Sequence, residues 1–383
     1  MARILLGWEL GANRGHWTAL ERIAASLRSE GHSVAAALQR TDALAPGTGT
    51  AIFQAPVWPR LLVSSSPARP ANVSTMGDIL CRLGLDMPGV LAGLVTAWDS
   101  IFDAWKPDFV VGEFAPAMLL AARGRATTVA TGTGFLQPPA HLSALPRLQG
   151  EPGFDEALTL DTVDADLRQT GRDPLPALPA LFAADHHLVA TFTDVDPYAA
   201  HRLTSHCAPN VAMPPLSDGS GEEIFVYAFA ATMSASALWD ALAASGRPVR
   251  VHIPDAPEAF LKRLRGAGLK VEPRPVSWEL IARRSRLIVS HGGHGLLCTA
   301  LLSGVPHLVT HYDLEKSLNA AALERIGVGM GVPLRADRAT ITAAIASAYG
   351  DDAMAERARA AAPGFRARMD PTFDARLRAI MAG

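Results

Sequence analysis

The chain has 383 residues, of which 49% are hydrophobic and 19% charged, and its formal net charge is −2. This length predicts two domains of ordinary size with well-buried cores. A nearly neutral chain without a basic block argues against nucleic acid as the main partner. The three cysteines are widely spaced and form no CxxC pair, which argues against a disulfide scaffold or a zinc site and favours the cytoplasm. No apolar run approaches the ~20 residues of a transmembrane helix.

The first half of the chain alternates strands with helices. Apolar residues at helical spacing mark a buried helix face within 16–30, and Gly31 ends that helix. The stretches 45–73 and 132–179 are rich in proline and glycine and are predicted to be mainly loop. The expected elements are strands at 4–7, 33–38, 109–111 and 127–131, and helices at 16–30, 91–105 and 116–122.

A polar segment at 209–222, with Pro214-Pro215 and then Ser217-Asp-Gly-Ser-Gly221, predicts an interdomain linker. A second alternating series follows it. Alternation of this kind predicts parallel sheets flanked by helices, so we expect two Rossmann-like α/β domains that bind ligands beyond the carboxyl ends of their strands. The expected elements are strands at 224–228, 249–253, 287–290, 307–310 and 327–332, and helices at 235–244, 259–264, 278–283, 295–302, 318–326 and 373–381.

The most informative stretch is Ser290-His-Gly-Gly-His-Gly295, which directly follows the buried strand Leu287-Ile288-Val289. Three glycines within four residues allow a sharp turn and a close approach of the backbone to a ligand. The first amides of the helix that follows have no partner inside that helix. A strand, a glycine turn and a helix N-terminus together favour anion binding. We therefore predict a phosphate or pyrophosphate site; a tight connection that needs glycine only for sterics is the alternative.

This pattern resembles the two-domain GT-B glycosyltransferases, and within them the UDP/dTDP-glycosyltransferase family that acts on macrolides and other natural products. The resemblance covers roughly half the chain, and its specific part is the region 289–329. In the first half, Gly15-His16 after the first strand and Glu30-Gly-His-Ser-Val34 also match. The matching residues of the second half are His291, Gly293, Gly295, Gly304-Val305-Pro306, Glu315, Asn319-Ala320 and Arg325-Ile-Gly-Val-Gly329.

The resemblance implies a fold and a division of labour. Two Rossmann-like domains with parallel sheets would face across a cleft, with the acceptor on the first domain and the nucleotide sugar on the second. The domains would span 1–208 and 223–365, joined by the linker at 209–222. A C-terminal helix within 366–383 would pack back on the first domain.

The resemblance also implies an inverting sugar transfer. His16 would remove a proton from an acceptor hydroxyl, because a histidine titrates near neutrality. Glu113, which stands where the family more often has an aspartate, would hold the far imidazole nitrogen. A polar residue at a helix start and a solvated carboxylate at a strand end are the plainer alternatives for these two residues.

The remaining contacts follow from the same resemblance. The glycine loop would bind the donor diphosphate as it leaves, and neither a metal nor a cofactor beyond the nucleotide sugar is expected. The acceptor would be a small molecule that the apolar loops suggest is hydrophobic. Donor contacts are expected from Ser290, His291, Gly292, Gly293, His294, Gly295, Thr299, Glu315, Lys316, Asn319 and Trp278, and acceptor contacts from Gly15, Trp17 and Phe135.

Three departures from the family pattern bear on the donor. Leu296 replaces a Ser/Thr, which removes a hydroxyl donor to phosphate. Thr299 replaces the acid that holds both ribose hydroxyls in UDP-sugar enzymes, and a threonine cannot accept two hydrogen bonds as a carboxylate can. This favours a dTDP-sugar, with a UDP-sugar next. Lys316 replaces a glutamine, which would either favour an anionic or unusual sugar or pair with Glu315.

Two other functions stay open at this point. The losses at Leu296 and Thr299 are compatible with a relative that binds a nucleotide sugar or a partner protein without catalysis. A nucleotide-sugar epimerase would use the same architecture with no acceptor. Neither the sugar, the acceptor nor the oligomeric state follows from these residues.

Overall fold

The computed structural model describes residues 1–11, 15–41, 50–61 and 73–382. The chain divides into two compact units. The first unit comprises Met1–Thr191, Asp196–Cys207 and Pro371–Gly383, and the second comprises Phe192–Val195 and Ala208–Asp370.

The first unit is built on a parallel sheet that contains seven strands among the described residues, in the order β3-β2-β1-β4-β5-β6-β7. The strands are β1 (Arg3–Trp8), β2 (Ser33–Leu38), β3 (Ala51–Gln54), β4 (Phe109–Glu113), β5 (Thr127–Gly132), β6 (His186–Ala190) and β7 (His206–Cys207). The helices are α1 (Gly15–Ser29), α2 (Met76–Leu83), α3 (Val90–Trp105), α4 (Pro116–Ala122), α5 (Glu156–Gln169) and α13 (Phe373–Ala382).

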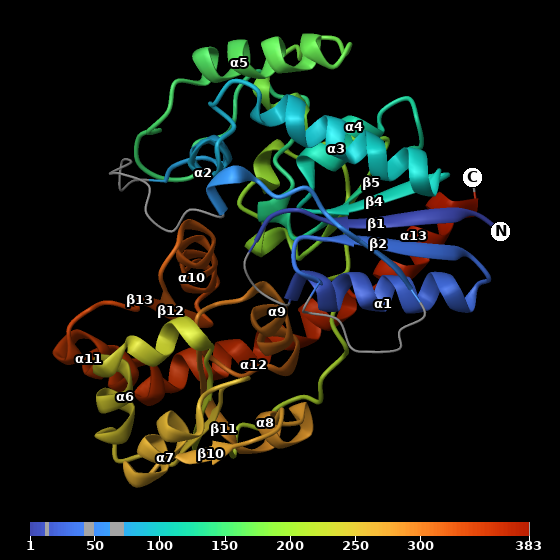
Figure 1. Ribbon diagram of the computed structural model, residues 1–383. Helices are drawn as coiled ribbons and strands as arrows, with labels where there is room; N and C mark the ends of the chain where they lie inside the picture. The colour runs from blue at the N-terminus through green and yellow to red at the C-terminus, as the bar shows by residue number, and fades with distance from the viewer. Residues whose placement is uncertain (12–14, 42–49, 62–72, 383) are drawn as a thin grey trace. The chain divides into compact units, whose positions relative to one another are not determined.

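Helices cover both faces of this sheet. Figure 1 shows α1 on one face and α3 with α4 on the other. Leu20, Ile23 and Leu27 of α1 join Ile4 and Leu6 of β1 in one buried cluster. Phe373 and Leu377 of α13 belong to the same cluster, so the end of the chain packs in the core of the first unit.

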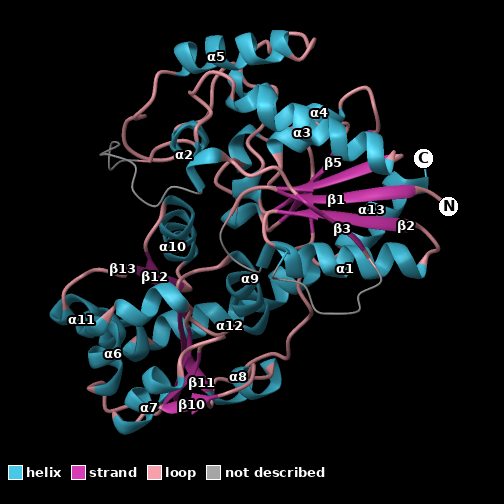
Figure 2. Cartoon of the chain, in the orientation of Figure 1, coloured by secondary structure: helices cyan, strands magenta, loops and turns pink. Residues whose placement is uncertain are grey.

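The second unit is built on a parallel sheet with six strands among the described residues, in the order β10-β9-β8-β11-β12-β13; Figure 2 shows both sheets in magenta. The strands are β8 (Glu223–Tyr227), β9 (Val249–His252), β10 (Lys270–Glu272), β11 (Ser285–Ser290), β12 (His307–His311) and β13 (Gly329–Pro333). The helices are α6 (Ser236–Ala243), α7 (Glu258–Gly266), α8 (Trp278–Arg284), α9 (His294–Ser303), α10 (Leu314–Ile326), α11 (Arg338–Gly350) and α12 (Asp352–Ala367).

The expected α/β alternation with parallel sheets is confirmed, and each predicted strand and helix is present with small shifts of its ends. One shift moves a site residue. The helix expected at 318–326 begins at Leu314, because the Asp313 carboxylate caps it by accepting from the Lys316 amide at 2.9 Å. Glu315 therefore lies in the first turn of α10 and not on the loop before it.

Several elements lie outside the prediction. The stretch 45–73 falls partly outside the described residues, and its described part contains β3. Helix α5 lies in the stretch predicted to be loop, where the Asp155 carboxylate caps the amides of Ala157 and Leu158. The other elements that were not predicted are α2, α11, α12, β6, β7 and β10.

Candidate active site

A histidine and a glutamate meet at the carboxyl ends of two neighbouring strands in the first unit. The register of the sheet pairs Trp8, the last residue of β1, with Glu113, the last residue of β4. His16 is the second residue of α1, the helix that follows β1. Its Nδ1 lies 3.2 Å from Glu113 Oε1, and the two side chains are 18% and 6% exposed. The predicted contact between His16 and Glu113 is therefore present.

The imidazole of His16 is confined by its surroundings. The Trp8 ring stacks on it with centroids 5.5 Å apart and planes at 25°, and the Phe114 ring lies 6.4 Å away. Gly11, with φ of +96°, passes so close that a Cβ there would lie 2.1 Å from His16 Nε2. Only glycine combines this backbone conformation with this approach.

This geometry would allow His16 to act as a general base held by a carboxylate. In the tautomer that carries its proton on Nδ1, His16 donates to Glu113, and Nε2 is left to accept a proton. In that role the carboxylate would stabilise the imidazolium that forms. A base of this kind can activate a hydroxyl nucleophile.

The residues predicted to contact an acceptor lie in different environments. Gly15 begins α1, and a Cβ there would meet nothing within 4 Å. Trp17 is 4% exposed and packs in the core with Leu20. Phe135, in the turn after β5, is also buried. Both aromatic rings therefore belong to the packed interior of this structure, because each lies on the inward face of its element.

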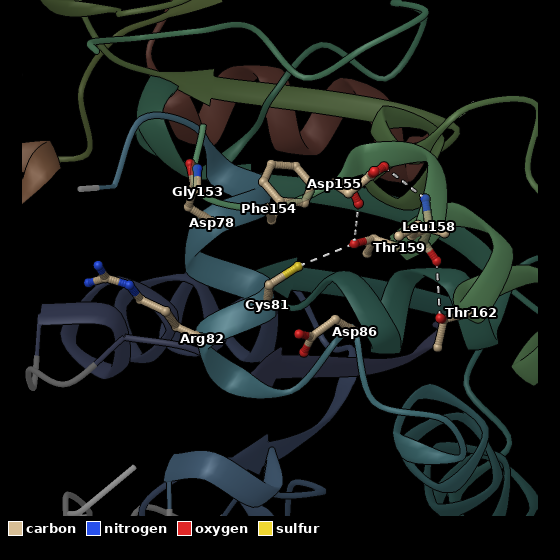
Figure 3. A pocket seen from close by; sticks show the side chains of 10 residues that line it. All are labelled: Asp78, Cys81, Arg82, Asp86, Gly153, Phe154, Asp155, Leu158, Thr159 and Thr162. Carbon is tan, nitrogen blue, oxygen red and sulfur yellow. Dashed lines mark hydrogen bonds between the residues drawn. The ribbon is translucent and has the colours of Figure 1, made fainter. Parts of the chain in front are cut away.

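The first unit contains a cavity of about 310 Å³ between α2 and the start of α5 (Figure 3). The predicted site residues do not line it. In Figure 3 the Cys81 thiol of α2 points toward the Thr159 hydroxyl of α5, and their Sγ and Oγ1 atoms are 3.6 Å apart. The lining residues are Asp78, Cys81, Arg82, Asp86, Gly153, Phe154, Asp155, Leu158, Thr159 and Thr162.

In the second unit the glycine loop forms a tight turn between β11 and α9. Gly292 has φ of +81°, and a Cβ there would lie 2.5 Å from Val309 Cγ1, so the position requires glycine. The Gly292 amide donates to Ser290 Oγ at 3.0 Å, and its carbonyl accepts from Asn319 Nδ2 at 2.9 Å. These two contacts hold the turn from both sides.

The N-terminus of α9 has a glycine at its N-cap position. Its N-cap residue, Gly293, supplies no side-chain hydrogen bond to the first turn. Helix amides without such a cap carry partial positive charge and suit phosphate. The predicted anion site is therefore geometrically possible at this helix end.

His291, at the start of the turn, is buried with the ring atom Nδ1 lacking a hydrogen-bond partner. Aromatic rings surround it, with the Phe229 centroid 4.6 Å and the Tyr227 centroid 6.1 Å away. Burial, together with the positive charge of Lys316, lowers the pKa of His291 to about 4. The imidazole is therefore neutral at pH 7 and can offer a ring N–H to an anion.

Lys316 and Glu315 form an ion pair on the first turn of α10, and Asp313 Oδ2 lies 3.9 Å from Lys316 Nζ. Burial disfavours the ammonium, but the two carboxylates outweigh it and raise the pKa of Lys316. Lys316 therefore stays charged near neutral pH. Of the two roles foreseen for it, pairing with Glu315 is present.

The other residues predicted to contact the nucleotide sugar have partners nearby in the structure. Thr299 Oγ1 donates to the Gly295 carbonyl of its own helix at 2.8 Å. His294 Nε2 lies 3.4 Å from the Cys298 thiol. Trp278 packs against the cluster of Ile281 and Ile288.

Residues that were not predicted also line the glycine loop. Phe229 and Tyr312 have ring centroids 5.5 Å apart, and Tyr312 lies 6.4 Å from His291. His307 Nε2 lies 2.8 Å from Ser290 Oγ behind the turn. The signal that could have revealed the two aromatic residues is their position just after β8 and β12, since the ends of parallel strands share one edge of a sheet.

Two Asp-x-Asp pairs occur in the sequence, and both have structural roles. The Asp166 carboxylate accepts the amides of Gly89 and Leu91 at 2.7 and 2.9 Å. Asp196 pairs with Arg202 and His206. Within the described ranges, no group of three or more His, Cys, Asp or Glu residues could hold a metal ion.

None of the helices described here is long and apolar enough to cross a bilayer.

Comparisons with known proteins agree with this architecture. Spinosyn rhamnosyltransferase SpnG superposes with a TM-score of 0.68 at 18% identity over 100% of both chains. The calicheamicin glycosyltransferase CalG4 gives 0.69 at 17% identity over 100% of this chain and 97% of its own. The chain has the GT-B fold.

The C-terminal part of this GT-B chain also matches at the level of sequence. Residues 273–374 match the model of the Erythromycin biosynthesis protein CIII-like C-terminal domain. O-mycaminosyltylonolide 6-deoxyallosyltransferase of Streptomyces fradiae is 34% identical over 119 residues, which cover 30% of this chain and 27% of the relative. The chain thus matches about a quarter of the length of this curated relative, and the predicted resemblance to natural-product glycosyltransferases is confirmed.

Proposed function

We propose that the protein is an inverting glycosyltransferase that transfers a sugar from a nucleoside diphosphate donor to a hydroxyl of a small natural-product acceptor. The observation that carries this proposal is the 3.2 Å contact between His16 and Glu113 at the strand ends of a GT-B chain. The match of residues 273–374 to a family of antibiotic biosynthesis proteins supports the same activity.

The proposed reaction exchanges one bond at the anomeric carbon. His16 Nε2 takes the proton of the acceptor hydroxyl while that oxygen attacks the carbon from the face opposite the diphosphate. The bond between the carbon and the diphosphate oxygen breaks, and the electron pair leaves with the nucleotide. Glu113 stabilises the imidazolium, which later returns its proton to solvent.

The second unit would bind the departing diphosphate. The first-turn amides of α9, which follow an N-cap glycine, and the neutral ring of His291 would supply donors where negative charge develops. Asn319 holds the turn through the Gly292 carbonyl, so its proposed role is support of the loop.

The donor that we propose is a dTDP-sugar, with a UDP-sugar as the second choice. Thr299 has no carboxylate with which to hold two ribose hydroxyls, and its own hydroxyl already donates to the Gly295 carbonyl. Solved structures of SpnG and SsfS6, which share this fold, are complexes with thymidine diphosphate.

The acceptor that we propose is a hydrophobic small molecule. A solved structure of SpnG contains the spinosyn aglycone, and the buried Trp8 and Phe114 rings beside His16 make the surroundings of the proposed base apolar. An apolar environment of this kind suits a ligand that offers little polar surface.

The decisive experiment measures sugar transfer from dTDP- and UDP-sugars to a panel of hydrophobic aglycones by mass spectrometry. His16→Ala should lower kcat by about 10²–10⁴-fold, because the general base is lost. His201→Ala, which changes an exposed histidine of the same unit, is the control and should keep wild-type kcat.

Equal rates for wild type and His16→Ala would contradict the mechanism. Binding of the nucleotide sugar without any turnover would identify a non-catalytic binding protein. Conversion of the nucleotide sugar in the absence of an acceptor would identify an epimerase.

A further inference from the structure

Glu9, the first residue after β1, is a buried carboxylate that the proposed mechanism does not use. It is 0% exposed. Its Oε1 accepts from the Met118 amide at 2.7 Å and from the Trp98 indole, and its Oε2 accepts from the Ala117 amide at 3.1 Å. These donors belong to α3 and to the first turn of α4.

All of these partners are hydrogen-bond donors, so the ionised carboxylate matches them. A protonated acid would direct its own hydrogen at a donor. Burial raises the pKa of Glu9 to about 7, although the hydrogen bonds from Ala117 and Trp98 oppose this effect. Burying an ionised carboxylate costs folding free energy. Its presence here therefore favours a role in holding the backbone in place.

The first turn of α4 is joined to Glu113 by a very short connection. Only Phe114 and Ala115 separate Glu113 from Pro116, the first residue of α4. Phe114 has φ of +48°, a conformation that costs energy in a non-glycine residue and persists only where the surroundings enforce it. The Phe114 carbonyl accepts from the Leu10 amide at 3.1 Å.

The two neighbours of Glu9 in the chain contact the same pair. Trp8 stacks on His16 and is paired in register with Glu113. Leu10 donates to Phe114, directly after Glu113. The segment Trp8–Leu10 therefore contacts the imidazole, the helix after Glu113 and the strained residue between them.

We propose that Glu9 is a positioning residue: by binding the first amides of α4, it holds the backbone from which Glu113 reaches His16. This inference rests on the proposed function for its kinetic consequence. Its structural consequence, the distance between His16 and Glu113, is independent of any activity.

The test is Glu9→Gln, whose amide group turns a donor toward the donors of α3 and α4. We expect kcat to fall by ~10²-fold, since a displacement of about 1 Å in a catalytic group has an effect of this size. The donor KM should stay within about twofold, because the proposed donor contacts lie in the second unit. If Glu9→Gln does not fold, Glu9→Asp keeps the charge with a shorter reach and should lower kcat in the same direction.

The matched control is Asp166→Asn. Asp166 is also a buried carboxylate of the first unit that accepts three helix amides, those of Gly89, Leu91 and Ala92 at the start of α3. The Asp166→Asn variant should lower the melting temperature, as Glu9→Gln does, while its kcat stays within about threefold of wild type. A kcat loss in Asp166→Asn equal to that in Glu9→Gln would overturn the positioning role.

Two further readouts separate positioning from general destabilisation. In a Glu113→Gln background, Glu9→Gln should lower kcat by less than about threefold. Both changes disrupt the same pairing of His16 with residue 113, so their effects should not add. Independent full losses would overturn the proposal. In a crystal structure of Glu9→Gln, the 3.2 Å contact between His16 Nδ1 and Glu113 Oε1 should open beyond hydrogen-bonding distance. An unchanged contact would sink the inference even if the wild type transfers no sugar.

Discussion

Lys316 is the positive charge that balances two carboxylates at the start of α10. Its ammonium is buried on the first turn of α10, paired with Glu315 and near Asp313. A helix start normally attracts acidic side chains, and here the two acids hold a cation that the sequence motif alone would not require. The cluster therefore depends on Lys316 for its charge balance.

Lys316→Gln, which introduces the glutamine of the family pattern, should destabilise the protein by about 2 kcal/mol. The change leaves two partly buried carboxylates without their cation, and partial exposure reduces the penalty of a fully buried pair. Urea unfolding at pH 7 measures this effect. The double variant Glu315→Gln/Lys316→Gln should recover part of the lost free energy, and a single variant as stable as wild type would contradict the account.

At the scale of elements, the backbone conformation of Gly292 and the hydrogen bonds to its amide and carbonyl fix the turn between β11 and α9. Gly292 needs a positive φ and approaches Val309 closely, while Ser290 and Asn319 hydrogen-bond its amide and carbonyl. This arrangement fixes the turn that leads from β11 into the first residues of α9. The element thus provides the proposed anion site, whatever residue follows the loop.

Gly292→Ala should lower stability by about 1–3 kcal/mol, because the new Cβ meets Val309 and the backbone conformation is strained. It should also weaken dTDP binding, measured by calorimetry. Gly93→Ala is the control: Gly93 lies within α3 with nothing within 4 Å of a new Cβ. This change should stabilise the protein by about 0.5–1 kcal/mol through helix propensity and leave dTDP binding unchanged. Equal dTDP affinities for Gly292→Ala and wild type would argue against the anion site.

At the scale of the whole molecule, buried and half-buried histidines couple stability to pH. Burial lowers the pKa of His187 and His291 to about 4 and that of His307 to about 3. The unfolded chain takes up protons at these residues as the pH falls through about 6.5, whereas the folded protein does so only near the lowered values. Glu9 acts in the opposite sense, because its raised pKa lets the folded state bind a proton first.

The free energy of unfolding should therefore be highest above pH 6.5 and fall as the pH drops toward 4.5. Each histidine contributes a slope of up to about 1.4 kcal/mol per pH unit, and Glu9 offsets about one of the three. Urea titrations at several pH values measure the slope. His187→Asn removes one of these groups and should make the slope shallower, while a stability that is flat or rises toward pH 5 would refute the assignment.

The sequence by itself determined the alternation of strands and helices, the glycine turn and the proximity of His16 to Glu113. Apolar periodicity and glycine placement act over a few residues, and the ends of parallel strands meet at one edge whatever the side chains. The resemblance to the glycosyltransferase family, placed on this framework, assigned the Glu113 carboxylate to His16 across 97 positions of sequence.

Only the tertiary structure decided the contacts that depend on how elements pack. It placed Phe135 in the core, directed Asn319 at the Gly292 carbonyl, and buried Glu9 against α4. Which loop side chain turns inward, and which amide lies within reach of a side chain, depends on crossovers and helix orientation. These are set jointly by distant parts of the chain, so local sequence patterns carry no record of them.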